Sequence, residues 1–387
     1  MNRNHQDPAL QGARPATTWT RWRPEWPLPL ALATAAVFLV FGNTWLNDPT
    51  APLRLTAFFT WLFVTILLAA MRVVYHAECL AIRFGEPYGT LILTLSVTSI
   101  EVLMIAALML HGDNNPTLAR DSMFAVVMIV LNGLVGLALI LGALRYHEQS
   151  YNLQGTRAYL SVIVPLAVLS LVLPTVTVST PEPTLNAFQS VFLLLISLAL
   201  YGTFLMIQTR RHRSYFSDDG DRGSDEGADA VGDHPVPDSP YRHSALLLTY
   251  LALAIVLAEA LAIPLDIGIE VLRLPAPLGG LIVATLVLTP EAISAVRAAL
   301  KNRLQRAVNI SMGSVLATIG LTVPCVLTIS LIVGKPVELG LSAADGLLLG
   351  LTLVSAILTF SGNRTNVLQG VVHLILFLAY LMLIVAP

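Results

Sequence analysis

Charged side chains are scarce in this chain. They make up 12% of its 387 residues, whereas hydrophobic side chains make up 55%. A sizeable soluble domain would need a polar surface that this composition does not supply, so a polytopic membrane protein is predicted. Cysteine is rarer still, because Cys79 and Cys325 are the only two and neither belongs to a CxxC pair. The sequence therefore indicates neither a disulfide framework nor a cysteine metal site.

Sequence motifs of enzymes and of dedicated calcium loops are also missing. The chain has no HExxH motif, no cluster of metal-binding histidines and no Ser/His pair in facing apolar runs. The acidic stretch at 218–238 is not an EF-hand. In a loop that begins at Asp219, position six is Ser224 instead of glycine and position twelve is Ala230 instead of glutamate. The basic residues from Arg297 to Arg306 are explained by positive-inside anchoring, with some affinity for anionic lipid. No enzyme, cofactor or nucleic-acid partner is expected; the predicted partners are transported ions and membrane lipid, and the oligomeric state is left open.

Apolar runs of membrane-spanning length dominate what remains. Eleven of them are predicted as transmembrane helices, at about 27–46, 52–75, 88–111, 121–144, 157–179, 185–208, 244–264, 277–299, 307–333, 342–360 and 366–385. A polar tail, residues 1–26, precedes the first run, which reads as an uncleaved helix rather than a signal peptide. An acidic linker, residues 209–243, separates the sixth run from the seventh.

The basic residues predict the orientation. With the N-terminus in the cytoplasm, eleven spans place all but four of the 22 Lys and Arg residues on the cytoplasmic side, as membrane insertion favours. The four exceptions are Arg54, Arg120, Arg273 and Lys335. A missed or extra span would scramble this partition. We therefore expect an integral membrane protein, in a bacterial inner membrane, with a cytoplasmic N-terminus and an external C-terminus.

One stretch occurs twice. Residues 86–101, EPYGTLILTLSVTSIE, recur at an offset of 190 as residues 276–291, APLGGLIVATLVLTPE. Each copy ends in a glutamate, Glu101 or Glu291, twelve residues after an aligned glycine. At 1.5 Å per residue each carboxylate lies roughly 18 Å into a core about 30 Å thick, near its midplane. The repeat predicts two five-helix halves, 52–208 and 244–387, plus one extra N-terminal helix.

An odd number of spans in each half inverts the second half relative to the first. Inverted repeats with a midplane site between them are typical of secondary transporters. A buried carboxylate is a candidate functional group, because its charge is costly unless it is paired, hydrated or protonated. The alternative is that Glu101 and Glu291 are protonated and merely hydrogen-bond helices together.

Two carboxylates can serve both a cation and protons. They could give Ca²⁺ up to four oxygen ligands. When no cation is bound, two like charges in a low dielectric favour protonation, so exchange of about two protons for one divalent cation is expected. Further candidate ligands at similar depth are the hydroxyls of Thr98, Ser99 and Thr289. The Leu286 carbonyl is another, because Pro290 cannot donate a hydrogen bond to it.

Three weaker signals lie outside the repeat. Glu259, at membrane depth in the seventh run, is a candidate proton relay or a hydrogen-bonded interfacial residue. His76 and Glu78 are interpreted as a solvated helix end, with an inner vestibule as the alternative. His373 is interpreted as a core histidine with satisfied hydrogen bonds.

The paired glutamates, the eleven runs, the acidic linker and the segments NRLQRAVNISMGSVLATIGLTVP and NRTNVLQGVVHLILFLAY resemble the calcium/proton antiporters of the CaCA superfamily, in particular the bacterial ChaA type. The resemblance covers nearly the whole chain after residue 50. It implies that Glu101 and Glu291 bind cations and protons, with Asn132, Asn309 and Ser314 as supporting ligands. Exchange of Ca²⁺ for H⁺ is the predicted function; Na⁺(K⁺)/H⁺ antiport at the same site is the alternative, ahead of a cation channel or a membrane enzyme.

Overall fold

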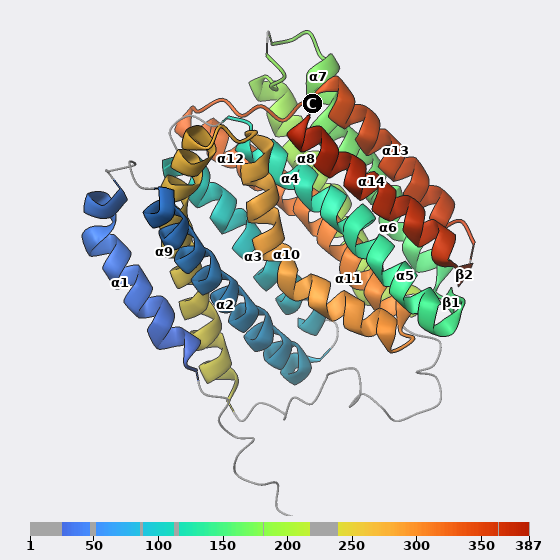
Figure 1. Cartoon of the computed structure of the whole chain (residues 1–387). Coiled ribbons are helices and arrows are strands. Elements are labelled where there is room, and N and C mark those ends of the chain that lie inside the picture. Colours follow the sequence, from blue (N-terminus) through green and yellow to red (C-terminus); the bar gives the residue numbers. More distant parts are fainter. Residues whose placement is uncertain are drawn as a thin grey trace, which may run out of the picture.

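The computed structural model is a bundle of helices (Figure 1). It describes residues 25–46, 52–85, 88–111, 116–180, 182–216, 239–362 and 364–386. The predicted tail up to residue 24 and most of the acidic linker, 217–238, lie outside the described residues.

The first half of the chain forms six helical rods. Their elements are α1 (Pro27–Leu46), α2 (Pro52–Phe84), α3 (Tyr88–His111), α4 (Leu118–Met128), η3 (Ile129–Leu134), α5 (Val135–Tyr146), α6 (Leu153–Ala167), η4 (Val168–Val172), α7 (Leu173–Val176), α8 (Ala187–Met206), η5 (Ile207–Arg211) and η6 (Arg213–Tyr215). The elements η3, η4 and η5 are π-helical turns that continue the preceding α-helix.

The second half forms five rods. Their elements are α9 (Pro240–Val271), α10 (Pro277–Leu300), α11 (Leu304–Ala317), the π-helical turn η8 (Thr318–Thr322), α12 (Val323–Val333), α13 (Ala343–Thr359) and α14 (Val367–Val385). Two short strands, β1 (Gln149–Ser150) and β2 (Arg364–Thr365), pair antiparallel and join the two halves at one end of the bundle.

Each of the eleven predicted apolar runs is helical, which confirms an all-α membrane protein. Eight helical segments within the described ranges are long and apolar enough to cross a membrane, and three shorter apolar helices accompany them. Two predicted ends were wrong. The helix α2 continues past residue 75 to Phe84, and α9 continues through Pro264 to Val271. Hydropathy marks where apolar residues stop, whereas a helix continues through polar residues that favour its backbone conformation.

The helices α3 and α10 lie in the middle of the molecule, with α1, α2 and α9 on one side and α5, α13 and α14 on the other (Figure 1). Both central helices pack against α11 and α4. In addition α3 packs against η8 and α12, and α10 packs against η3 and α5. Each central helix therefore contacts a rod that is interrupted by a π-helical turn.

One glycine makes the approach of α10 to α4 possible. A Cβ atom at Gly280 would lie 2.5 Å from the backbone carbon of Asp121 and 2.6 Å from the backbone nitrogen of Ser122. Backbone atoms cannot yield as a flexible side chain can, so the crossing requires a residue without a side chain. The contact fixes α10 against the rod that carries η3.

Candidate functional site

Glu101 lies on α3 and is buried, with 5% of its surface exposed. Its two carboxylate oxygens accept hydrogen bonds from two threonines of η8. The Thr318 hydroxyl donates to Oε2 at 2.7 Å, and the Thr322 hydroxyl donates to Oε1 at 3.3 Å. Both threonines are fully buried. A carboxylate near the predicted midplane thus receives a donor on each oxygen from the other half of the chain.

The spacing of the two threonines explains how one rod supplies both donors. Residues four apart lie on nearly the same face of a helix, and a π-helical turn is a common device at functional sites. Thr318 and Thr322 are not among the predicted ligands, because the sequence does not reveal which face of this rod meets Glu101. The available signal was a pair of hydroxyls, four residues apart, in the apolar run at 307–333.

Glu291 lies on α10 and is half-buried. Its Oε2 atom is buried and has no hydrogen-bond partner among the residues that the structure describes. The Ser314 side chain, on α11, is within hydrogen-bonding reach of this carboxylate, as the prediction of a supporting ligand requires. The carboxylates of Glu101 and Glu291 are also close enough to interact electrostatically. The two glutamates of the repeat are therefore brought together.

The other predicted hydroxyls bond to their own helices. Thr98 donates to the Thr94 carbonyl at 2.9 Å, and Thr289 donates to the Thr285 carbonyl at 2.6 Å. Such back-bonding leaves the hydroxyl oxygen free to accept a further bond. Ser99 is half-buried on α3.

The helix α10 continues through Pro290, one turn after Leu286. Proline has no N–H group, so it cannot donate the helical hydrogen bond that the Leu286 carbonyl would otherwise accept. Leu286 itself is fully buried. Its carbonyl therefore stays a predicted ligand, one turn before the glutamate of α10.

The hydrogen bonds of Asn132 lead away from both glutamates. Asn132, in η3, is fully buried and donates to the Thr352 hydroxyl at 2.8 Å. Its Oδ1 atom lies 3.0 Å from His373 Nδ1, and His373 Nε2 lies 3.0 Å from the Thr359 hydroxyl. His373 is fully buried with a partner on each nitrogen, which confirms its interpretation as a satisfied core histidine.

Asn309, on α11, also has its amide occupied. It donates to the Phe216 carbonyl at 2.6 Å and accepts a hydrogen bond from Gln305 at 2.9 Å. Glu259 is half-buried on α9, which packs against α3. The roles of these two residues as ligand and relay stay predictions.

The interpretation of His76 as a solvated helix end was wrong. His76 is 1% exposed and its ring stacks on that of Tyr250. Hydropathy could not reveal this burial, because the groups that cover this part of α2 are distant in sequence. They are α9 and Glu25, which lies two residues before α1.

Among the described residues, no group of three or more His, Cys, Asp or Glu side chains could hold a metal ion. A cation between Glu101 and Glu291 would therefore complete its shell with hydroxyl, carbonyl and water oxygens. Hard cations accept such a mixed set of oxygen ligands.

A helical membrane bundle that brings two carboxylates together on its central helices has the architecture of an ion-coupled secondary transporter. Residues 54–210 and 243–386 match the family model described as sodium/calcium exchanger protein, and the chain belongs to this family. The family consists of antiporters rather than enzymes. The resemblance to the CaCA superfamily is thereby confirmed.

Individual relatives agree with this assignment. The chain is 40% identical over 360 residues to the sodium-potassium/proton antiporter ChaA of Escherichia coli (strain K12), covering 92% of this chain and 94% of the relative. It is 24% identical over 271 residues to a Ca²⁺/H⁺ antiporter of Aphanothece halophytica, covering 65% and 72%. The solved structure of native YfkE has a TM-score of 0.70 at 19% identity, with 93% of this chain and 100% of that chain covered, and supports the fold.

Proposed function

We propose that the chain exchanges Ca²⁺ for H⁺ across the membrane and that Glu101 and Glu291 bind both ions in turn. One observation carries the proposal: Glu101 is buried, holds a hydroxyl donor on each oxygen and lies within electrostatic range of a second carboxylate, that of the half-buried Glu291. Two negative charges in a low dielectric need compensation by either protons or a cation. Binding of one ion therefore displaces the other.

The same charge balance links the ion to movement. The site is nearly neutral with two protons or with one divalent cation. In either form, the change that exposes the site to the opposite side of the membrane has a low energetic cost. The doubly charged empty form crosses poorly, because an uncompensated charge in the membrane interior is expensive. This difference enforces exchange and predicts about two protons for each Ca²⁺.

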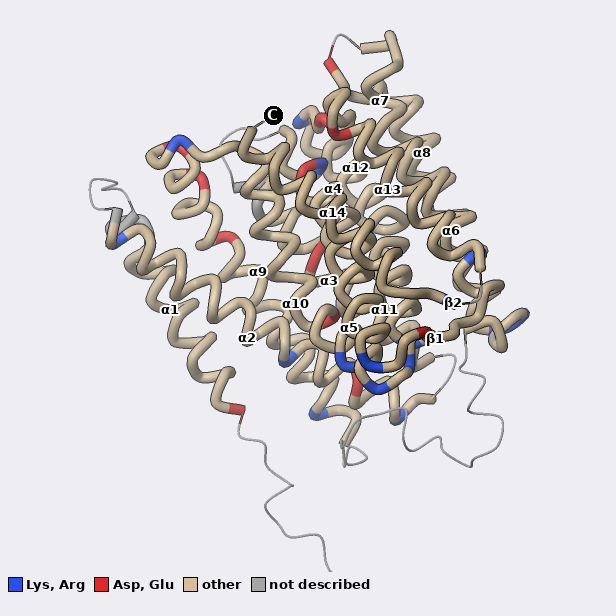
Figure 2. Tube along the Cα trace, turned by 45° about the vertical axis from the view of Figure 1, so that its right-hand side comes forward, with Lys and Arg blue, Asp and Glu red and all other residues tan. Residues whose placement is uncertain are grey.

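The proposed arrangement is one extra helix and two inverted halves of five spans each, which is suited to alternating access. The offset of 190 that aligns the glutamates places η3, residues 129–134, on 319–324, beside η8 at Thr318–Thr322. The packing of α3 against η8 and of α10 against η3 follows the same relation. Figure 2 shows Lys and Arg gathered around the end of the bundle that carries β1 and β2, which supports a cytoplasmic location for that end in a bacterial inner membrane.

The site combines the two carboxylates with neighbouring oxygens. Thr318 and Thr322 hold Glu101, and Ser314 supports Glu291. The remaining proposed cation ligands are Thr98, Ser99, Asn132, Thr289, Asn309 and the Leu286 carbonyl. Glu259 is proposed as the proton relay between the site and the outside.

A second candidate is Na⁺(K⁺)/H⁺ antiport at the same carboxylates. It is favoured by the 40% identity to ChaA, whose name records sodium-potassium/proton antiport. A monovalent cation would exchange with fewer protons, because it neutralises one charge rather than two. The two candidates share the site and differ in the ion.

Purified protein in proteoliposomes with an internal pH dye tests both candidates. Addition of CaCl₂, NaCl or KCl to separate samples should release protons for the transported cation only. Glu101→Gln and Glu291→Gln should each abolish the response, whereas the matched control Glu270→Gln, an exposed glutamate of α9, should retain it. A response to NaCl or KCl alone would select the second candidate. Full exchange in either site variant would contradict the proposed role of these glutamates.

A further inference from the structure

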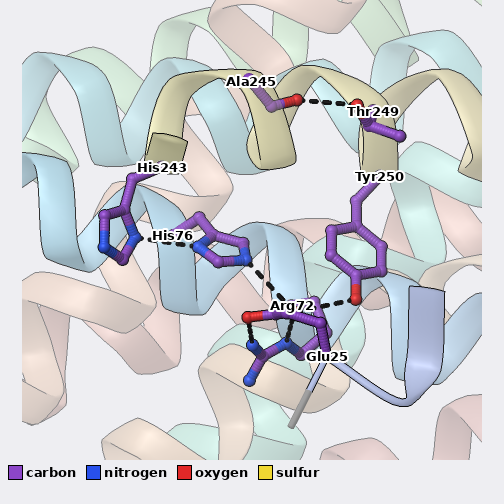
Figure 3. A network of polar contacts seen from close by, with 7 residues as sticks. All are labelled: Glu25, Arg72, His76, His243, Ala245, Thr249 and Tyr250. Atoms are coloured by element: carbon purple, nitrogen blue, oxygen red, sulfur yellow. Dashed lines mark hydrogen bonds and ion pairs between the residues drawn. The ribbon is translucent and has the colours of Figure 1, made fainter. Parts of the chain in front are cut away.

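A second buried cluster of titratable groups lies where α1, α2 and α9 meet (Figure 3). It contains Glu25, which lies two residues before α1, together with Arg72 and His76 on α2 and His243 and Tyr250 on α9. α2 and α9 form the most extensive contact between two helices in the described chain. The cluster is separate from the site of Glu101 and Glu291, and the exchange mechanism makes no use of it.

Glu25 is the anion of this cluster and is shared among its neighbours. Arg72 binds both of its carboxylate oxygens, and the Tyr250 hydroxyl donates to Oε2 at 3.0 Å. His76 Nε2 lies 3.7 Å from the same oxygen. Arg72 thus already balances the charge of Glu25. The same carboxylate can accommodate one protonated imidazole beside it, but not two.

The two histidines contact each other directly. His76 Nδ1 and His243 Nδ1 are 3.0 Å apart. At this distance one nitrogen must carry the proton and the other must accept it, so only one of the two Nδ1 atoms can be protonated. If both rings became imidazolium ions, two N–H groups and two positive charges would face each other across the contact.

The groups around the pair oppose a second charge. The charged groups that act on the rings are Glu25 before α1, Arg72 on α2 and Arg242 on α9; Tyr250 stacks on His76, and Tyr75 contacts both rings. Two of the three charges are positive. His76 is 1% exposed, whereas His243 is half-buried in the first turn of α9, from which a proton can enter.

We propose that the His76–His243 pair is a proton-binding site outside the transport site, and that protonation of both rings breaks this pair and loosens the packing of α2 against α9 around it. Both helices pack against α3, which carries Glu101. Loss of the contact therefore changes the support of the transport site. Under the proposed orientation the pair faces the cytoplasm, and exchange slows when the cytoplasm is already acidic. The effect on rate rests on the proposed antiport; the effect on helix contact does not.

Distance measurements test the contact without any transport. Cys79→Ala and Cys325→Ala remove the native thiols, and Phe84→Cys on α2 with Tyr241→Cys on α9 adds two exposed positions for spin labels. The distance between the labels should increase or broaden as the pH falls from about 7 to about 4, because the second proton enters against positive neighbours and therefore binds below the usual histidine range near pH 6.5. The change should be absent when His243→Gln is added. A distribution that ignores pH, or that responds equally in the His243→Gln chain, would overturn the proposal.

Rate measurements test the consequence. In everted vesicles the cytoplasmic face meets the bath, and a saturating cation concentration removes competition between protons and cation at the carboxylates. The maximum rate of the wild type should fall as the bath becomes acidic, by at most about tenfold per pH unit for one proton. His76→Gln and His243→Gln should flatten this profile, and the exposed control His147→Gln should leave it unchanged. Identical profiles in all four chains, with exchange intact, would refute regulation by the pair while leaving the antiport function standing.

Discussion

The glutamates of the two halves of the chain differ in their hydrogen bonds. Glu101 receives a hydroxyl hydrogen bond on each oxygen, whereas Glu291 keeps a buried Oε2 atom with no partner in the described structure. At the repeat offset of 190, the positions that correspond to Thr318 and Thr322 are Met128 and Asn132. Both halves therefore have a π-helical turn beside the opposite glutamate, but only one turn carries donors that reach it.

The side chains of the other turn are used elsewhere. Asn132 bonds to Thr352 and contacts His373, and its amide also donates to the sulfur of Met128 at 3.6 Å. A buried polar atom without a partner costs about 1–3 kcal/mol, and more when it is charged. Similar backbones thus give a pre-organised carboxylate on α3 and an unsatisfied one on α10. We expect Glu291 to be the carboxylate whose occupancy by proton or cation changes first.

Removal of the donors to Glu101 should have the largest effect. Valine has nearly the shape of threonine but no hydroxyl group. Thr318→Val together with Thr322→Val therefore leaves Glu101 without its two hydrogen-bond donors. Each hydrogen bond to a charged group contributes about 1.5–3 kcal/mol, so the KM for the cation should rise about 100-fold. The measurement is initial exchange rate against cation concentration in proteoliposomes.

The matched control for this change is Thr328→Val. That hydroxyl donates to the Pro324 carbonyl of its own helix at 2.7 Å and is expected to be neutral for exchange. A change in KM of less than about threefold in the double variant would show that the two halves are functionally alike despite their different hydrogen bonds.

Release of Asn132 should have the next largest effect. His373→Ala leaves Asn132 and Thr359 each without one buried partner, and should lower the free energy of unfolding by about 2–4 kcal/mol. Thermal unfolding in detergent measures the loss. In a double-mutant cycle with Asn132→Ala, the two losses should add to more than the loss in the double variant by at least about 0.5 kcal/mol. Strict additivity would mean that the two side chains do not depend on each other.

Neutralising each glutamate in turn should change the free energy of unfolding by a smaller amount, with opposite signs for the two halves. Glu291→Gln replaces a carboxyl group whose Oε2 atom is buried without a partner, and should raise the free energy of unfolding by about 1 kcal/mol. Glu101→Gln disturbs two existing hydrogen bonds and should lower it by a similar amount. Thermal unfolding of both variants in the absence of transported cation is the measurement. Equal shifts in the same direction would remove the asymmetry.

The smallest effect is expected where polar pairing is exposed. Arg364 binds Glu148 at 3.0 Å beside the strands that join the halves, and their side chains are 69% and 55% exposed. Exposed ion pairs contribute about 0–1 kcal/mol because water and salt screen them. Glu148→Gln should therefore leave the unfolding temperature nearly unchanged. A loss as large as that of His373→Ala would show that the junction at β1 and β2 limits stability.

The sequence predicted much of this fold because hydropathy reports membrane burial directly. All eleven apolar runs are helical, and the repeat identified both glutamates. Contacts between segments that are distant in sequence could not be predicted from hydropathy. Thr318 and Thr322 were missed because their role depends on which face of η8 meets α3. The burial of His76 was missed because Glu25, assigned to a polar tail, folds back onto α2.

The pairing of β1 with β2 has a mechanical consequence. Gln149 pairs with Thr365 and Ser150 with Arg364, so the loop between α5 and α6 is tied to the loop between α13 and α14. Tyr151 also donates a hydrogen bond to the carbonyl of Gly362, across the same junction. These four helices are therefore tied to one another at this end. A rocking movement that alternates access would carry them together, and the displacement would fall on α1, α2 and α9 on the opposite flank (Figure 1).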